Sequence, residues 1–275
     1  MEEKIKTNNK TLRVEELIND SINSSQFNEE STSKVRYDYF VRKEKKLIKK
    51  FNKLCVRIER KIAKSYDKNF AEQILFQAKK EYKDLIPRIP YFGGTINPFN
   101  EIIMIAAQMT AVHKALKQNG KSTEETLLIF YDLVDDLFKK MPKPFLWFGQ
   151  KFVFSPLFIK LMQRISRRMS AMNDPNGFDF HYYKGDGKNN DWYFVAKQCG
   201  VVNFFKREGC EDIAHYCNFV DAIQGKALKL GVHCKTCLGS GDATCEEYMK
   251  QGRETVMPES ISRLLEQRSV VINTK

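Results

Sequence analysis

The sequence lacks any segment typical of export. Its first 33 residues, from Met1 to Ser33, are mostly polar and contain no apolar stretch of the kind found in a secretory signal. We therefore expect a chain that stays in a reducing, cytoplasmic compartment, where structural disulfides are rare. A disulfide framework is accordingly disfavoured, and residues 1–33 are expected to form a disordered or loosely attached leader.

The sequence also lacks the glycine-rich patterns that bind nucleotides. Neither a GxGxxG motif nor a P-loop is present, and no internal repeat occurs. The 275 residues are 42% hydrophobic and 29% charged, a composition typical of a globular protein that can bury a large core. Without a nucleotide-binding motif, the sequence makes no cofactor certain.

Positive charge is concentrated in one segment. Between Lys34 and Lys68 the chain has 14 Lys/Arg and 4 Asp/Glu, a local excess of 14 − 4 = +10. Apolar residues recur there at three- and four-residue intervals, which predicts an amphipathic helix with its basic side chains in solvent. Aromatic residues are not interleaved on that basic side, so nucleic-acid binding is disfavoured. A basic adaptor that acts through this helix is kept as a third functional candidate.

Further helices are expected over 69–86, 99–118 and 122–140. Asn97-Pro98 is a typical helix start, and Ser122 with Glu125 forms a capping box. The aromatic stretch from Phe145 to Met162 is nearly long enough to span a membrane but contains Lys151 and Pro156. We favour a buried helix or a lid there over a helix resting on a membrane surface, with arginines 164, 167 and 168 as its basic flank.

After residue 172 the periodicity changes from helix to strand. Apolar residues alternate with polar ones from Phe178 to Tyr182 and from Trp192 to Ala196, and two more strands are expected at 228–234 and 244–249. The predicted fold class is α+β: a helical N-terminal half followed by a small antiparallel sheet with helices on it. We expect one domain over 34–252, mainly helical over 34–172 and cysteine-rich over 173–252. A tail with a short helix, at 253–275, follows this domain.

Six of the seven cysteines lie between Cys199 and Cys245. Such a group indicates a nucleophilic site, a thiolate metal site or a disulfide framework. Cys217 and Asp221 share a helix face because they are four residues apart. A carboxylate does not activate a thiol, so Asp221 is better suited to acid/base chemistry or to binding a substrate ammonium group.

Three features of this segment form a recognisable pattern. Cys199 lies at a strand end, Gly209 precedes a Cys217-x3-Asp221 step, and a turn reads Cys237-Leu-Gly-Ser-Gly-Asp-Ala-Thr-Cys245-Glu-Glu-Tyr. With these features, the chain resembles the L-2-amino-thiazoline-4-carboxylic acid hydrolase family over about 97–249. The resemblance implies a hydrolase that breaks a non-peptide C–N bond in a small, cyclic amidine-like molecule and leaves a carbamoyl product.

The resemblance also implies roles for individual residues. Cys217 or Cys245 would be the nucleophile, Asp221 would move protons, and Cys199 would complete the site. Lys235 stands where the family has an arginine, which makes it a weaker, monodentate group for a substrate carboxylate. Only one of Glu246 and Glu247 can face the site, since they are successive residues of a strand. Glu246 is preferred because it stands in place of the family's Asp.

Three further residues are assigned to substrate binding. Gly241 and Asp242 belong to a turn whose backbone N–H groups could face an oxyanion. His113 is included as well, although a histidine on an apolar helix is more often a hydrogen-bonded core residue. The expected partner of the chain is thus a small molecule.

The alternative function is a non-catalytic metal protein. Cys234 and Cys237, preceded by His233, form a Cys-x-x-Cys pair that, with Cys210, Cys217 or His215, could bind zinc or a similar soft ion. No second Cys-x-x-Cys pair balances it, and no thioredoxin-like context supports a redox role. Cys55 and Cys210 are also interpreted as small buried hydrophobic residues.

Overall fold

The basic segment forms a helix that is buried on one side only. In the computed structural model, which describes residues 36–94 and 97–273, the short helix α2 (Asp38–Val41) leads into α3 (Glu44–Ser65). The inward face of α3 carries Leu47, Phe51, Cys55, Ile58 and Ile62, all buried. The predicted amphipathic helix is therefore confirmed, and Cys55 is a core residue. The expected leader, residues 1–33, lies outside the described residues.

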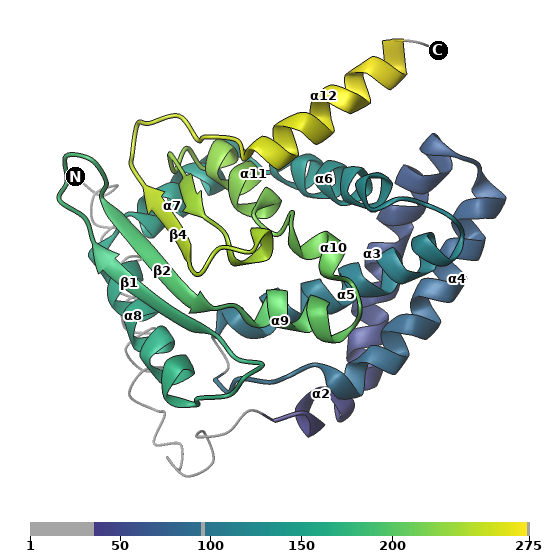
Figure 1. Cartoon of the computed structure of the whole chain (residues 1–275), viewed down its shortest axis with the longest axis horizontal. Helices are drawn as coiled ribbons and strands as arrows, with labels where there is room; N and C mark the ends of the chain where they lie inside the picture. The colour runs from purple at the N-terminus through teal and green to yellow at the C-terminus, as the bar shows by residue number, and fades with distance from the viewer. Residues whose placement is uncertain (1–35, 95–96, 274–275) are drawn as a thin grey trace, which may run out of the picture. The chain divides into compact units, whose positions relative to one another are not determined.

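Two packed helices form the centre of the helical half. Helix α4 (Lys68–Leu85) packs between α3 and α5 (Pro98–Gln118), and the 3-10 turn η2 (Ile86–Arg88) directly follows α4. The side chain of Asn97 accepts a hydrogen bond from the Phe99 N–H, as expected for this helix start. The capping box of Ser122 and Glu125 opens α6 (Thr123–Lys139), and both of its hydrogen bonds are present. These helix starts are therefore confirmed (Figure 1).

The aromatic stretch after residue 142 departs from the prediction. It forms two helices, α7 (Lys143–Val153) and α8 (Pro156–Ala171), and Pro156 begins the second. Helix α7 contains no buried residue, so the expected buried helix is not found there. Its inner side is only partly covered, by a small core that includes Leu146 and Val153. No helix among residues 36–94 and 97–273 is both long and apolar enough to cross a membrane.

Four antiparallel strands form one sheet in the order β1-β2-β4-β3. They are β1 (Asp179–Lys184), β2 (Trp192–Gln198), β3 (His233–Thr236) and β4 (Cys245–Met249). Strand β3 is shorter than expected because Leu228, Leu230 and Val232 pack in the loop before it, against Trp192 and Met249. The α+β class is confirmed: Figure 1 shows the sheet with α8 lying across one face.

Short helices join the strands and carry much of the cysteine-rich segment. They are α9 (Gly200–Arg207), α10 (Glu211–Ala214), α11 (Phe219–Ala227) and the 3-10 turn η3 (Leu238–Ser240). The expected C-terminal helix is present as α12 (Glu259–Asn273). It packs on α6 through the buried Ile261 and Leu264, and Arg268 pairs with Asp132 at 2.6 Å.

We predict that Ser122→Ala lowers the free energy of unfolding by about 1 kcal/mol, because the hydroxyl that accepts the Glu125 N–H is lost. Urea denaturation followed by circular dichroism measures the change. Ser65→Ala is the control: Ser65 is exposed at the last position of α3, and its replacement should change stability by less than about 0.5 kcal/mol. Equal stability of the two variants would contradict the role of the cap.

Candidate functional site

Four thiols from separate elements meet beside the inner face of the sheet. Cys217 lies between α10 and α11, Cys234 in β3, Cys237 just before η3, and Cys245 at the start of β4. The sulfurs of Cys217 and Cys237 are 3.5 Å apart, and Cys245 hydrogen-bonds to both Cys234 and Cys237. We call these four residues the thiol cluster. All seven cysteines are free thiols.

Strand register places two members of the cluster on one face. In β4, Cys245 pairs with Ala196 of β2, and Glu247 lies between Phe194 of β2 and Cys234 of β3. Residues paired across antiparallel strands project from the same face. A register shift between Cys234 and Thr236 then turns the chain toward η3. The ligand atoms of Cys234, Cys245 and Glu247 consequently lie within 4.8 Å of one another.

A glycine allows the third and fourth members to approach. A Cβ atom on Gly239 would lie 2.0 Å from the carbonyl oxygen of Ala214 and 2.9 Å from the sulfur of Cys217. Only a residue without a side chain lets η3 pack this closely on the end of α10. Gly239 thus brings Cys237 to Cys217.

The structure corrects the choice of glutamate. Glu247 is buried beside the thiol cluster, whereas Glu246 lies on the opposite face and accepts a hydrogen bond from the Tyr248 hydroxyl at 2.9 Å. The expectation that only one of the two could face the site is confirmed. The selection of Glu246 is wrong, because the strand alternation at this register directs Glu247 inward.

Two acidic side chains lie together behind the thiols. Asp221 of α11 and Glu247 of β4 are hydrogen-bonded to each other, and neither has an ion-pair partner within the described residues. Burial, and then the nearby Cys237, raise the pKa of Asp221 to about 7. Burial, and then the neighbouring Asp221 carboxyl, raise the pKa of Glu247 well above its usual range. Glu247 therefore stays protonated, and its O–H donates a hydrogen bond to the Asp221 carboxyl. One oxygen of Glu247 has no hydrogen-bond partner.

Cys237 has the environment of a thiolate. Hydrogen bonds from Cys217 and then Cys245 lower the pKa of the Cys237 thiol far below its ordinary value, and the backbone N–H groups of Gly239 and Ser240 contribute. The two donating thiols have raised pKa values for the same reason, first through their hydrogen bonds and then through burial. The hydrogen bond from Cys245 also lowers the pKa of Cys234, so the cluster favours negative charge on Cys237 and, next, on Cys234.

Cys199 lies at the edge of this group. It precedes α9, and burial raises the pKa of its thiol to about 11. Its sulfur is near enough to Cys237 and Asp221 to be affected by their charges. The structure thus brings Cys199, Cys217, Asp221 and Cys245 into one region, as the sequence predicts.

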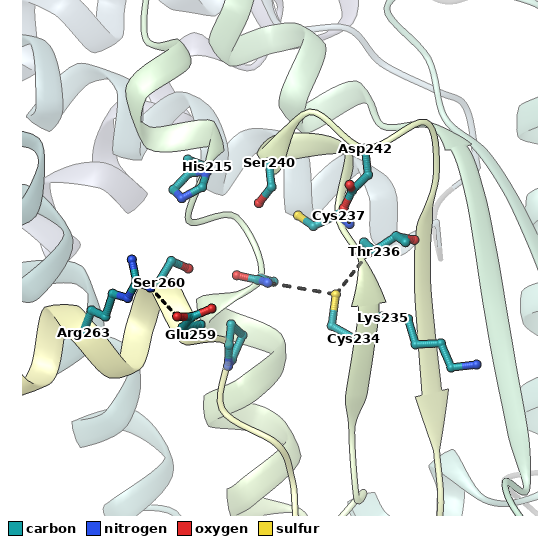
Figure 2. A pocket seen from close by; sticks show the side chains of 12 residues that line it. His215, Cys234, Lys235, Thr236, Cys237, Ser240, Asp242, Glu259, Ser260 and Arg263 are labelled. Atoms are coloured by element: carbon teal, nitrogen blue, oxygen red, sulfur yellow. Dashed lines mark hydrogen bonds and ion pairs between the residues drawn. The ribbon is translucent and has the colours of Figure 1, made fainter.

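A cavity of about 350 Å³ opens above the thiol cluster. Figure 2 shows Cys234 and Cys237 in it, with side chains from α12 on the opposite side. The other lining residues are His215, Asn218, Lys235, Thr236, Ser240, Asp242, Pro258, Glu259, Ser260 and Arg263. Asn218 is buried, with its amide nitrogen 4.0 Å from the Cys234 sulfur and its amide oxygen unpartnered.

The residues expected to bind substrate have different places. Lys235 is exposed at the cavity, with its ammonium group 4.3 Å from the centre of the Tyr248 ring. Asp242 also lines the cavity, but its carboxylate accepts the Cys237 N–H at 2.7 Å and so holds the turn. Gly241 ends η3 with a φ of 95°, a conformation that favours glycine.

His113 does not belong to this site, which corrects the prediction. It is fully buried in α5, with Nδ1 3.2 Å from the Thr126 hydroxyl and Nε2 3.1 Å from the Asp212 carboxylate. Burial lowers the pKa of the imidazole, so it is a neutral, hydrogen-bonded core residue. It does not line the cavity because α5 turns this residue toward α6 and α10 instead.

The alternative metal set is only partly assembled. Cys234 and Cys237 are in the thiol cluster, and His215 is exposed at the cavity. Cys210 is a buried residue at the turn before α10, with a pKa raised by burial to about 11, and it lies among Glu208, Asp212 and Lys114 instead. The interpretation of Cys55 and Cys210 as buried small residues is confirmed.

Comparisons with protein-family models, with curated proteins and with solved structures found no match to this chain.

Three residues of the site are not identified by sequence reasoning. In the sequence analysis Glu246 is preferred over Glu247, and Asn218 is not considered although it directly follows Cys217. Arg263 lies in the segment that the sequence predicts to be a tail. The only signal for Asn218 is its position beside Cys217. For Arg263 no sequence signal exists, because its approach depends on how α12 folds back.

We predict that Asp221→Asn stabilises the protein increasingly as pH rises from about 4 to about 7. The folded-state pKa of Asp221 is raised above its ordinary value of 3.8, so the wild type loses stability as the unfolded chain releases this proton first. Urea denaturation at a series of pH values measures the difference between variant and wild type.

Asp212→Asn is the control of opposite sign. Burial opposes ionisation of Asp212, but hydrogen bonds from Lys117 and Thr123 outweigh it and lower the pKa of this carboxyl to about 2. Its contribution to stability is present above about pH 4 and is lost as pH falls toward 2. An Asp221→Asn difference that does not change with pH would show that the carboxyl is not protonated in the folded protein.

Proposed function

We propose that this protein is a thiol-dependent hydrolase that breaks a non-peptide C–N bond in a small, polar cyclic amidine. One observation carries the proposal: a thiol with a strongly lowered pKa, Cys237, lines a cavity of about 350 Å³ and has a hydrogen-bonded pair of acids behind it. A cavity of this size suits a small molecule. The motif resemblance to the thiazoline-carboxylate hydrolases supports the same reaction class.

The geometry favours Cys237 as the nucleophile over Cys217 and Cys245. A nucleophile must be a thiolate and must reach the substrate. Cys217 and Cys245 are the donors that stabilise the Cys237 thiolate, and neither lines the cavity. Their part in the reaction is to hold the charge on Cys237 until it attacks.

The proposed reaction has two steps. The Cys237 sulfur adds to the sp2 carbon of the amidine, the ring C–N bond breaks, and the leaving nitrogen takes a proton from a water molecule, which the Asp221 carboxyl behind the thiols reprotonates. Water then adds to the sulfur-bound carbon, a proton returns to the Asp221 carboxylate, and the carbon–sulfur bond breaks. The products are a carbamoyl compound with a free amine and the regenerated thiolate. A pKa of about 7 suits Asp221 to both directions of proton transfer.

The cavity also contains groups that could hold a substrate carboxylate. Lys235 and Arg263 are the cationic residues in its lining, and His215 adds an imidazole. The Lys235 ammonium group lies over the Tyr248 ring on the outer face of the sheet, and its side chain extends away from the thiols (Figure 2). Arg263 lies on the cavity side, where it is paired with Glu259 of the same helix. The proposed role of Arg263 is therefore to bind the substrate carboxylate in exchange for Glu259.

We predict that Cys237→Ser reduces turnover of 2-amino-thiazoline-4-carboxylate by at least about 10³-fold, because an alcohol at this position is not ionised. Cys217→Ser should cost about 10-fold, since it replaces one hydrogen bond to a charged sulfur. Product formation is measured by chromatography and mass spectrometry. Cys55→Ser is the control, buried in the helical half and away from the cavity. Full activity of folded Cys237→Ser would eliminate this mechanism.

A second candidate function is a soft-metal site, and the close approach of three ligand atoms favours it. Cys234, Cys245 and Glu247 lie within 4.8 Å of one another, and one Glu247 oxygen has no partner. Two thiolates on one tetrahedral zinc ion are separated by about 3.8 Å, which follows from Zn–S bonds of about 2.3 Å. Cys237, hydrogen-bonded to Cys245, is the nearest source of a fourth ligand. In this use of the cluster the thiolates are ligands and not nucleophiles.

If the metal site is real, the purified protein should bind about one equivalent of Zn²⁺, and Cys245→Ser and Glu247→Gln should each weaken binding at least about 10-fold. Elemental analysis gives the stoichiometry. Added Co²⁺ should give a thiolate charge-transfer absorption that Cys55→Ser retains and Cys245→Ser loses. A metal-free protein with full hydrolase activity and no cobalt–thiolate absorption would exclude the metal site and leave the hydrolase intact.

A further inference from the structure

The outer face of α7 is an exposed aromatic surface. Phe145, Trp147, Phe148 and Phe152 are 69%, 53%, 64% and 42% exposed, all within one helix of 11 residues. We call these four residues the aromatic face. Isolated exposed apolar residues are ordinary, but four large ones on a single short helix indicate a binding surface.

This exposure is fixed by the inner side of the helix. Gly149 faces Leu228 so closely that a Cβ atom would lie 3.2 Å from it. The Gln150 amide donates to the Lys229 carbonyl at 3.1 Å, and Leu146 and Val153 pack on the small core below the sheet. Because this inner side of α7 is held against the rest of the fold, the four aromatic side chains cannot turn inward and stay exposed. Lys151 lies over the Trp147 ring at 5.9 Å from its centre, so a cation is part of the same face.

The surrounding chain carries charge of one sign. From Leu137 to Asn173 there are 8 Lys/Arg and no Asp/Glu, a local excess of 8 − 0 = +8. On α7 and α8 the basic residues are Lys143, Lys151, Lys160, Arg164, Arg167 and Arg168. All six are exposed, and none has an ion-pair partner within residues 36–94 and 97–273. The helix that carries the aromatic face and the helix that follows it therefore both carry unpaired positive charge, which attracts anionic surfaces.

We propose that α7 docks on an anionic lipid bilayer, lying in the plane of the interface with its aromatic face among the headgroups and upper acyl chains. Trp and Phe with flanking Lys are the composition of such interfacial helices. An 11-residue helix is about 16 Å long, too short to span a bilayer but long enough to lie in one leaflet. This surface is separate from the thiol cluster, so the inference is independent of the proposed hydrolase.

Two other ligands of the aromatic face, a second copy of the chain and a nucleic acid, fit less well. Two copies of the chain meeting through this face would bring together two sets of six unpaired basic residues from α7 and α8, which is unfavourable at moderate salt. A nucleic acid would satisfy the charge but leave Phe145, Phe148 and Phe152 of a convex helix without the groove that single-stranded ligands follow. A lipid surface satisfies both the apolar and the charged requirements.

The test is sedimentation of the full chain with vesicles. Vesicles of phosphatidylcholine with about 30% phosphatidylserine should bind the protein, those of phosphatidylcholine alone should bind at least about 10-fold less, and added salt should weaken binding. The triple variant Phe145→Ser, Phe148→Ser, Phe152→Ser should lose at least about 10-fold in partitioning. Phe76→Ser is the matched control, because Phe76 is 77% exposed on α4, outside this region.

Tryptophan fluorescence gives a second, local measurement. Trp192 is 3% exposed, so a blue shift on vesicle addition reports Trp147 entering the bilayer. No sedimentation with anionic vesicles would overturn the proposal. So would equal loss in the Phe76 variant, or a triple variant that keeps vesicle binding and loses self-association or oligonucleotide binding instead.

Discussion

The antiparallel pairing of β4 between β2 and β3 is the constraint on which the candidate site depends. This register directs Cys245 and Glu247 to the inner face and places Cys234 opposite Glu247. A shift of β4 by one residue would send Cys245 and Glu247 to the outer face, where Glu246 and Tyr248 now lie, and would leave Cys234 without them. The close contact of Gly239 with α10 then adds Cys217 and Cys237. Without these two features the cysteines would be scattered.

The cluster gathers acidic groups without a counter-ion. Four thiols and two carboxyls occupy a region in which no lysine or arginine of the described chain pairs with Asp221 or Glu247. Such a group must keep protons, share them through hydrogen bonds, or bind a cation. In the hydrolase proposal the group keeps and shares its protons, with charge on Cys237 and a proton between the two acids. In the metal proposal the group binds a cation. Both arise from the same electrostatic requirement.

The two basic regions of the chain differ in which side of their helices the fold covers. Along α3 the basic residues are the solvated side of a helix whose apolar side is buried, so the charge needs no partner. Around α7 the pattern is reversed: the apolar residues are exposed together with the charge. Net charge alone does not distinguish these cases. What separates them is which face of the helix the rest of the fold covers.

Most of the helices, the number of strands and the α+β class were determined by the sequence, because periodicity, helix caps and turn residues act between neighbours in the chain; the helix expected over 145–162 and the bounds of β3 were not. The convergence of Cys199, Cys217, Asp221 and Cys245 was also foreseen from their placement at element ends. Only the tertiary structure decided that Glu247 and not Glu246 joins them, that His113 belongs to the core with Asp212, that Cys237 lines the cavity, and that α7 is exposed. Each of these depends on strand register or on packing between segments distant in sequence, and no local pattern encodes which of two adjacent faces a distant element will cover.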